Sequence, residues 1–260
     1  SDNPKYEQDI DARKLWEKII HNAWKSAEPG VLFWDTIIRE SIPDCYADEG
    51  FVTVSTNPCG EIPLCPYDSC RLLAMNLLSY VDNPFKADAK FNFDKLMDDI
   101  IDLELEKVEQ IIGKIAADPE DLDVRRVELE LWKKIREMAR KGRRTGLGIT
   151  AEGDMLAALG LRYGTQEAID FAVEVQKCLA LAAYGASVKM AAERGAFPVY
   201  DAAKEVNNPM IARIREADPA LYEEMTKVGR RNIAMLTIAP TGTTSLMSQT
   251  TSGIEPVFRT

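Results

Sequence analysis

The chain has 260 residues, 46% of them hydrophobic, and a formal net charge of −10, so it can bury the core of one large α/β domain or two small ones. The acidic balance argues against a protein that binds nucleic acid through a basic face, because such a face must neutralise phosphates. No apolar run approaches the roughly 20 residues that span a membrane, and we expect no secretory signal at the start.

Helices and strands are expected to alternate in the first part of the chain. Apolar residues at helical spacing predict a helix over residues 10–26, and the run 31–34 predicts a buried strand before a short helix at 36–40. The alternating run 51–55 predicts another strand. His21, the only histidine, falls inside the first helix, so we interpret it as a plain helix residue rather than a metal ligand.

The rest of the chain is expected to be rich in helix. Two charged helices, over 94–117 and 122–141, predict a solvent-exposed hairpin to which we assign no chemistry. The longest helix is expected over 166–194, with Cys178 near its apolar stripe and therefore in the core. The remaining elements expected are strands over 70–77, 142–150 and 233–238 and shorter helices over 151–159, 208–217 and 219–228.

Two glycines, Gly146 and Gly148, punctuate the second of these strands. They do not form a dinucleotide-binding fingerprint, because the third glycine is misplaced and no βαβ unit surrounds them. We expect them to let a helix pack closely on a strand.

The loop Asn57-Pro58-Cys59-Gly60-Glu61 is the first candidate site. Pro58 removes a backbone donor and Gly60 permits backbone geometries that a Cβ forbids, which favours a tight excursion of the chain. In an extended turn, residues two apart project to the same side, so Asn57, Cys59 and Glu61 could face one small substrate. They would offer it an amide, a reactive sulfur and a carboxylate that moves a proton. The alternative is that Cys59 is a small buried hydrophobe.

Cysteine usage indicates redox chemistry. Five cysteines, an odd number, favour free or catalytic thiols in a reducing compartment, which we expect to be the cytoplasm. Cys59, Cys65 and Cys70 follow one another at intervals of six and five residues, which fit no common zinc or iron–sulfur pattern, so we assign no metal ligands. A pair of thiols doing redox work is the better interpretation.

A second candidate site follows the last expected strand, where hydroxyl residues and a glycine precede an expected helix. Free N–H groups and the helix dipole at such a junction can bind an anion without basic residues. The stretch lacks the Gly-Lys-Ser/Thr of a P-loop, and a helix N-cap with extra threonines is the alternative. The candidate phosphate-binding residues are Thr241, Gly242, Thr243, Thr244 and Ser245.

Four motifs occur in an order that resembles the large catalytic subunit of ribonucleotide reductase. They are Asn57-x-Cys59-x-Glu61, Cys70 leading to Asn76-Leu77, Pro240-Thr241-Gly242-Thr243-Thr244-Ser245, and Ser252-Gly253-Ile254-Glu255-Pro256. The resemblance runs through the whole chain, including residues 143–148 and 193–198. The spellings Asn-Pro-Cys-Gly-Glu and Pro-Thr-Gly-Thr are those of the adenosylcobalamin-dependent (class II) branch.

The resemblance implies a role for each site residue. Cys59 would carry the transient thiyl radical that removes the ribose 3′ hydrogen, and Glu61 would deprotonate the 3′ hydroxyl as water leaves C2′. Asn57 would hydrogen-bond the ribose hydroxyls. Cys70 would help supply reducing equivalents and end in a disulfide, while the loop over 241–245 would bind the substrate's phosphates.

The fold implied is α/β, part of the family's ten-stranded α/β barrel. Residues 1–260 would be the central portion of the catalytic barrel domain, with a charged helical insertion at about 102–141 and the flanking parts of the barrel absent. The resemblance also implies a ribonucleoside di- or triphosphate substrate, a thioredoxin-like reductant, adenosylcobalamin as cofactor and a homodimer of the full-length enzyme. The family's second redox cysteine has no match here, so we expect this stretch alone to be inactive.

Two other interpretations stay open. One is the diiron-subunit-dependent branch of the same enzyme, which shares the Asn-x-Cys-x-Glu triad. The other is a nonenzymatic nucleotide-binding or assembly module, which would bind nucleoside diphosphate without radical chemistry. The sequence does not decide between a diphosphate and a triphosphate substrate, and it gives Cys65 no role.

Overall fold

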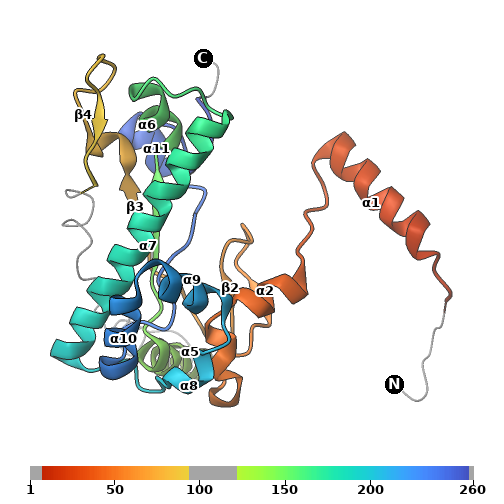
Figure 1. Ribbon diagram of the computed structural model, residues 1–260. Helices are drawn as coiled ribbons and strands as arrows, with labels where there is room; N and C mark the ends of the chain where they lie inside the picture. The colour runs from red at the N-terminus through yellow and green to blue at the C-terminus, as the bar shows by residue number, and fades with distance from the viewer. Residues whose placement is uncertain (1–7, 94–121, 258–260) are drawn as a thin grey trace. The chain divides into compact units, whose positions relative to one another are not determined.

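The computed structural model describes residues 8–93 and 122–257, and the chain divides into two compact units, residues 1–37 and 38–260 (Figure 1). The first unit holds α1 (Ala12–Ser26), which confirms the helix expected there. The Asp11 carboxylate caps α1 by accepting hydrogen bonds from the N–H groups of the next turn, at 3.0 and 3.2 Å. His21 lies on α1 with its ring centroid 5.8 Å from that of Trp24, as expected for a plain helix residue.

The buried strand expected at 31–34 is wrong. Val31, Leu32 and Phe33 have no regular structure and are 43%, 49% and 69% exposed, and α2 (Trp34–Glu40) begins at the last residue of the run. A short apolar run does not distinguish a strand from an exposed connection, because burial depends on partners that the local sequence does not name.

Three extended segments of the second unit run parallel to one another. β3 (Leu72–Asn76) pairs with β6 (Gly146–Thr150) along its whole length. On the other side of β6, the Leu147 N–H donates to the Met235 carbonyl at 2.6 Å and the Thr237 N–H donates to the Leu147 carbonyl at 3.0 Å. All of β6 is buried, as expected for a strand with neighbours on both sides. The strands expected at 70–77 and 142–150 are therefore confirmed in shorter form, whereas 233–238 contributes an isolated bridge.

The other strands form two short antiparallel hairpins. β1 (Ser55–Thr56) pairs with β2 (Pro63–Leu64), and β4 (Val81–Asp82) pairs with β5 (Lys90–Phe91). The strand expected at 51–55 is thus mostly outside the ladder, although residues 51–54 keep their alternation of buried and exposed side chains. Two 3-10 helices, η1 (Pro43–Glu49) and η2 (Leu77–Tyr80), precede these hairpins.

Most of the expected helices are present in the second unit. α7 (Gln166–Arg194) has the expected bounds; the Thr165 hydroxyl caps its start and Gly195, at a φ of +83°, ends it. α5 (Leu122–Gly142) is one arm of the expected charged hairpin, and the other arm lies outside the described residues. The remaining helices are α6 (Glu152–Ala158), α8 (Ala202–Glu205), α9 (Pro209–Ala217), α10 (Pro219–Val228) and α11 (Gly242–Ser248). Within the described ranges, no helix is both long and apolar enough to cross a membrane.

The apolar stripe of α7 joins two hydrophobic clusters. Val175 and Leu179 pack in one cluster with residues of β3, β6 and α6, whereas Tyr184 and Val188 pack in another with α9 and α10. Cys178 is half-buried against the first cluster, at the edge of the core in which it was expected. A third cluster consists of Tyr46, Phe51, Cys65, Phe197 and Ile233.

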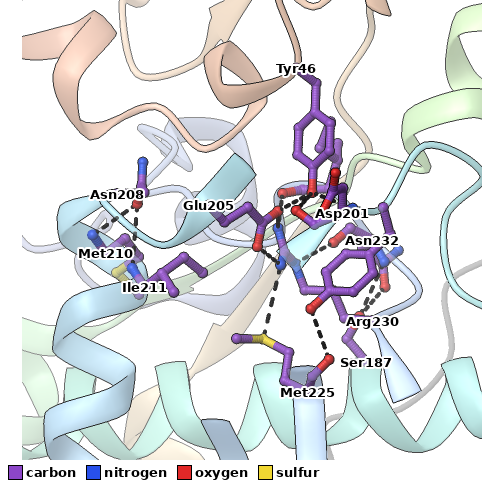
Figure 2. A network of polar contacts seen from close by, with 12 residues as sticks. Tyr46, Ser187, Asp201, Glu205, Asn208, Met210, Ile211, Met225, Arg230 and Asn232 are labelled. Carbon is purple, nitrogen blue, oxygen red and sulfur yellow. Dashed lines mark hydrogen bonds and ion pairs between the residues drawn. The ribbon is translucent and has the colours of Figure 1, made fainter. Parts of the chain in front are cut away.

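Arg230 joins distant parts of the chain through a fully buried ion pair (Figure 2). Its guanidinium donates two hydrogen bonds to the Glu205 carboxylate, at 2.5 and 2.7 Å, and the Tyr46 hydroxyl donates to the same carboxylate at 2.6 Å. A buried charge of this kind is tolerated only where its partners satisfy it, and this bidentate geometry does so.

Aromatic rings complete the surroundings of this arginine. The rings of Tyr184, Phe197 and Tyr200 have centroids 5.8, 5.3 and 5.6 Å from the guanidinium carbon. The guanidinium also donates to the Ile233 carbonyl at 3.1 Å. We call Arg230 with Glu205, Tyr46 and these three rings the Arg230 cluster. It holds the start of the extended segment that runs beside β6.

Candidate active site

A tight hairpin displays the first candidate site. β1 and β2 are joined by residues 57–62, and the Gly60 N–H donates to the Asn57 carbonyl at 3.0 Å. This bond closes a four-residue turn with Pro58 and Cys59 in its central positions, where the fixed φ of proline suits the first. Gly60 follows at a φ of +83°, in the left-handed region that favours glycine. We call residues 55–64 the finger hairpin.

Asn57 clamps the base of the finger hairpin. Its N–H donates to the Ile62 carbonyl at 3.2 Å, and its side-chain Oδ1 accepts from the Ile62 N–H at 3.0 Å. The side-chain oxygen is therefore used inside the loop. What Asn57 can offer to a substrate is its Nδ2 amide, a donor for hydroxyl oxygens.

Cys59 and Glu61 have different environments. Cys59 is exposed at the tip of the turn, whereas Glu61 is half-buried and its Oε2 is fully buried with no hydrogen-bond partner among the described residues. The Thr237 hydroxyl donates to the Glu61 carbonyl oxygen at 3.3 Å, which ties the finger hairpin to the segment beside β6. The Gly60 N–H bond to the Asn57 carbonyl makes the turn tight rather than extended, and the common face expected for Asn57, Cys59 and Glu61 stays a prediction.

Cys70 lies just before β3 and packs against β6. A Cβ on Gly146 would overlap the Cys70 sulfur, so only glycine lets the thiol take this position. Burial raises the pKa of Cys70 to about 11; the charge of Arg144 opposes this rise, and the charges of Asp68 and Glu61 add to it. A Cβ on Gly146 would also meet Thr237 Cγ2, and the Thr237 hydroxyl bonds the Glu61 carbonyl, so Thr237 connects the surroundings of Cys70 and Glu61.

Gly148 has a different task from the one expected. A Cβ at this position would overlap the Thr237 carbonyl oxygen. The expectation that Gly146 and Gly148 let a helix pack on a strand is therefore wrong: they admit Cys70 and the neighbouring extended segment. The local sequence identified the two glycines, but it did not indicate which segments of the chain pack against them.

The second candidate site is the start of α11. Thr241 precedes the helix at a φ of +53°, and the first intrahelical bond is donated by the Ser245 N–H to the Thr241 carbonyl at 2.8 Å. The N–H groups of Gly242, Thr243 and Thr244 come before that bond, and these three residues are exposed. Within the part of the chain that the structure describes, no side chain caps this helix, so its first N–H groups are suited to an anion.

The hydroxyls at the two ends of this loop hold the structure together. The Thr241 hydroxyl accepts from the Gly253 N–H at 2.8 Å and lies 3.1 Å from the Thr150 hydroxyl at the end of β6. The Ser245 hydroxyl is buried and lies 2.7 Å from that of Ser252. Thr241 and Ser245 therefore connect the loop to the motif over 252–256.

The two sites lie along one segment of chain. Thr237 bonds the finger hairpin, and Thr241 begins the α11 loop four residues later. At about 3.3 Å per extended residue, they are separated by at most about 13 Å.

An ion pair that no motif indicated lies beside Cys70. Asp68 Oδ2 lies 2.7 Å from Arg144 Nε, with both side chains almost fully buried. The available signal was that Asp68 lies two residues before the strand expected at 70–77, and Arg144 lies near the start of the strand expected at 142–150. In the described ranges, no group of three or more histidine, cysteine or acidic side chains is arranged to bind a metal ion.

Comparison with known proteins gives a consistent result. A family model described as "Ribonucleotide reductase, barrel domain" matches residues 1–260. The vitamin B12-dependent ribonucleoside-diphosphate reductase of Thermoplasma acidophilum is 34% identical over 259 residues, which cover 96% of this chain and 27% of that protein. The protein of the same name from Mycobacterium tuberculosis (strain H37Rv) is 34% identical over 249 residues, covering 95% and 29%. The chain thus spans under a third of the length of these relatives.

A solved structure agrees on the fold. The class Id ribonucleotide reductase alpha subunit of Actinobacillus ureae superposes with a TM-score of 0.60 at 22% identity, covering 94% of this chain and 39% of that one. The expected fold class, the α/β barrel of ribonucleotide reductases, is confirmed. Since the family model matches the whole chain, the chain belongs to the ribonucleotide reductase family.

Proposed function

We propose that the full-length protein reduces ribonucleoside diphosphates to 2′-deoxyribonucleotides through a thiyl radical on Cys59. The observation that carries this proposal is the finger hairpin, which combines an exposed thiol with the buried Glu61 Oε2 two residues later, an oxygen that has no hydrogen-bond partner in the described ranges. A buried oxygen without a donor suits a general base that receives a substrate hydroxyl. The names of the relatives favour a diphosphate over a triphosphate substrate.

Each residue would take one step. The Cys59 sulfur radical takes the hydrogen atom from C3′ and becomes a thiol. The Nδ2 amide of Asn57 holds the ribose hydroxyls. Glu61 accepts the proton of the 3′ hydroxyl while the C2′ hydroxyl takes a proton from Cys70 and leaves as water, which leaves a C3′ carbonyl and a radical at C2′. A second cysteine elsewhere in the full-length enzyme gives a hydrogen atom to C2′ and bonds to the Cys70 thiolate. The remaining electron of this disulfide radical anion and the proton held by Glu61 then restore the C3′ radical with its hydroxyl, and the disulfide is complete. Cys59 finally returns its hydrogen atom to C3′.

The exposed tip of the finger hairpin fits a radical source that acts from outside the loop. Pro58 and Cys59 are both exposed, so a large cofactor could approach the sulfur. Adenosylcobalamin, when bound in the full-length enzyme, would supply the initiating radical by homolysis of its cobalt–carbon bond. The vitamin B12-dependent relatives support this choice.

Substrate phosphates would bind at the start of α11. The exposed N–H groups of Gly242, Thr243 and Thr244 are suited to an anion, and Thr241 and Ser245 would fix the loop.

We further propose that residues 1–260 are the central part of the barrel domain, with a helical insertion at about 102–141. A thioredoxin-like dithiol would reduce the full-length enzyme, which would be a cytoplasmic homodimer. Its product would serve DNA replication.

The decisive experiment replaces Cys59 by serine in the full-length protein, with adenosylcobalamin and a ribonucleoside diphosphate. We expect nucleotide affinity to stay unchanged by calorimetry and deoxynucleotide formation to be lost, because oxygen does not readily replace sulfur as the radical carrier. Cys178→Ser, on α7 away from the finger hairpin, is the matched control and should retain activity. Turnover in Cys59→Ser would refute the assignment.

Two outcomes would favour the alternatives. A full-length protein that leaves the visible spectrum of adenosylcobalamin unchanged on titration would belong to the diiron-subunit-dependent branch. Nucleotide binding without radical chemistry under either cofactor system would favour a nonenzymatic nucleotide-binding or assembly module.

A further inference from the structure

A buried ion pair beside Cys70 takes no part in the steps proposed above. Asp68 Oδ2 and Arg144 Nε are 2.7 Å apart, and their side chains are only 2% and 6% exposed. Taking two charges out of water is costly, and such pairs are weak evidence for stability. The neighbouring cysteine gives this pair a possible chemical role instead.

The strand register places Arg144 beside Cys70. Leu72 of β3 is opposite Gly146 of β6, and stepping back two residues along both parallel chains brings Cys70 to the level of Arg144. The chains remain together there, because Arg71 Nη1 donates to the Arg144 carbonyl at 3.0 Å. The Cys70 sulfur also occupies the space where Gly146 lacks a side chain.

The surroundings of Cys70 contain unused hydrogen-bond donors. Arg144 Nη2 and Arg71 Nη2 are both buried and have no hydrogen-bond partner among the described residues. Buried guanidinium N–H groups normally have acceptors, and a deprotonated sulfur is an acceptor. Arg144 can therefore donate a hydrogen bond to a thiolate at Cys70 without breaking one that it already makes from Nη2.

Cys65 lies toward the other end of the ion pair. The Asp68 N–H donates to the Cys65 carbonyl at 3.2 Å, which closes a turn that brings the two residues together, and Cys65 is buried in the cluster with Phe51 and Ile233. Burial raises the pKa of Cys65 to about 12, and Asp68 is the charge that raises it further. For Cys70 the strongest charge effect on the pKa is the opposing one of Arg144. Both charges of the pair act on both thiols, but Asp68 has the larger effect on the pKa of Cys65 and Arg144 has the larger effect on that of Cys70.

We propose that the Asp68–Arg144 pair is a positioning element that distinguishes the two thiols: Arg144 faces Cys70 and stabilises its thiolate, whereas Asp68 holds Cys65 as a neutral thiol. This division would keep Cys65 out of the redox exchange although it is only five residues from Cys70. It also gives Cys65, Asp68 and Arg144 a function that the sequence motifs do not indicate.

The part that the Asp68–Arg144 pair would play in turnover rests on the proposed function. After turnover, one thiolate of a dithiol reductant bonds to the sulfur of the second cysteine, the disulfide breaks, and its electron pair stays on Cys70 as a thiolate. The other thiol of the reductant then displaces the second cysteine and leaves as a disulfide, and its two protons end on the two enzyme cysteines. Arg144 would stabilise the Cys70 thiolate formed in the first step.

Alkylation of the full-length protein by iodoacetamide tests the element without nucleotide, cobalamin or turnover. The charged groups facing Cys70 are Arg144, Asp68, Arg71 and Glu61. Rates for the Cys70 and Cys65 peptides are followed by mass spectrometry from pH 6 to pH 10. At pH 8 we expect Arg144→Gln to slow Cys70 alkylation about tenfold and Asp68→Asn to speed it severalfold, since one pKa unit is a tenfold change in thiolate.

The proposal predicts that Arg144→Gln and Asp68→Asn change the Cys70 alkylation rate in opposite directions. Both substitutions break the same ion pair, so a merely structural pair would change the Cys70 rate in the same direction in both variants. Arg144→Lys keeps the charge and should stay near the wild-type rate, and Asp68→Asn should also speed Cys65. If Arg144→Gln does not fold by circular dichroism, the other two variants decide in the same way.

Same-direction changes at Cys70, or no change in either variant, would overturn the proposal. Such a result would leave the outcome for Cys59→Ser untouched, because alkylation does not use the radical. Conversely, an inactive radical site would not alter the alkylation rates.

Discussion

Replacing Gly148 by alanine should separate β6 from the extended segment 234–238. The new Cβ would lie well under 3.0 Å from the Thr237 carbonyl oxygen, whereas unstrained carbon–oxygen contacts are found at about 3.3 Å or more, so the two backbones must part by on the order of 1 Å. The bonds Leu147 N–H to Met235 O and Thr237 N–H to Leu147 O, now 2.6 and 3.0 Å, would lengthen to about 3.6 and 4.0 Å, beyond hydrogen-bonding range.

The cost follows from these two bonds. Each is worth about 1 kcal/mol, and the groups left unpaired in a buried strand add to that, so we expect a local destabilisation of about 2 to 4 kcal/mol. Hydrogen exchange with mass spectrometry measures it at the amides of Leu147 and Thr237. Protection there should fall on the order of thirtyfold to a thousandfold, since about 1.4 kcal/mol is a factor of ten.

A matched control is available in α7. A Cβ on Gly185 would meet only Leu221 Cδ1, at 4.0 Å, so Gly185→Ala should leave exchange at Leu147 and Thr237 unchanged. It should also stabilise α7 by about 1 kcal/mol through helix propensity. Protection of Thr237 within about threefold of wild type in Gly148→Ala would show that the segments can move apart without losing their bonds.

Three further outcomes are expected of the full-length protein. Gly242→Val should weaken nucleotide binding in calorimetry more than Thr241→Ser, because a branched side chain obstructs a backbone anion site and serine keeps the hydroxyl that Gly253 uses; equal affinities would contradict that site. Glu61→Gln should lower the rate of deoxynucleotide formation about a hundredfold or more, and a rate within about twofold of wild type would exclude a general base. The neutral thiols of Cys65 and Cys70, whose pKa values are raised from about 9 to about 12 and 11, should contribute stability that is complete below pH 9 and lost as pH rises from 9 to 12. The urea midpoint should therefore fall more steeply over this range than in a variant with both cysteines replaced by alanine, and equal slopes would contradict the shifts.

The helices were predictable because their signals are local. α7 has the bounds expected from its apolar spacing, with Thr165 and Gly195 as start and stop residues. The expected strands at 31–34 and 51–55 share one source of error: the first does not form, and the second forms only at Ser55. Strand formation requires a partner, and these stretches find few or none among the described residues.

The candidate site was predictable in its positions but not in its geometry. The tight excursion expected over residues 57–61 is confirmed, since proline and glycine act locally on the turn, whereas the roles of Cys59, Glu61 and Cys70 stay predictions. The internal use of the Asn57 oxygen, the burial of Glu61 Oε2 and the pairing of Asp68 with Arg144 depend on contacts across many residues. No periodicity or turn rule contains that information.

The Arg230 cluster has a consequence for the order in which the chain folds. The Glu205 carboxylate joins Arg230, 25 residues away in sequence, to Tyr46, 159 residues away. Contacts of such long separation are entropically late, and a guanidinium cannot leave water before its carboxylate and rings are in place. The segment that leads to Thr237 and the α11 loop should therefore become rigid only when η1 and α8 have docked. Folding intermediates that lack this step would have the helices of this chain but no nucleotide affinity.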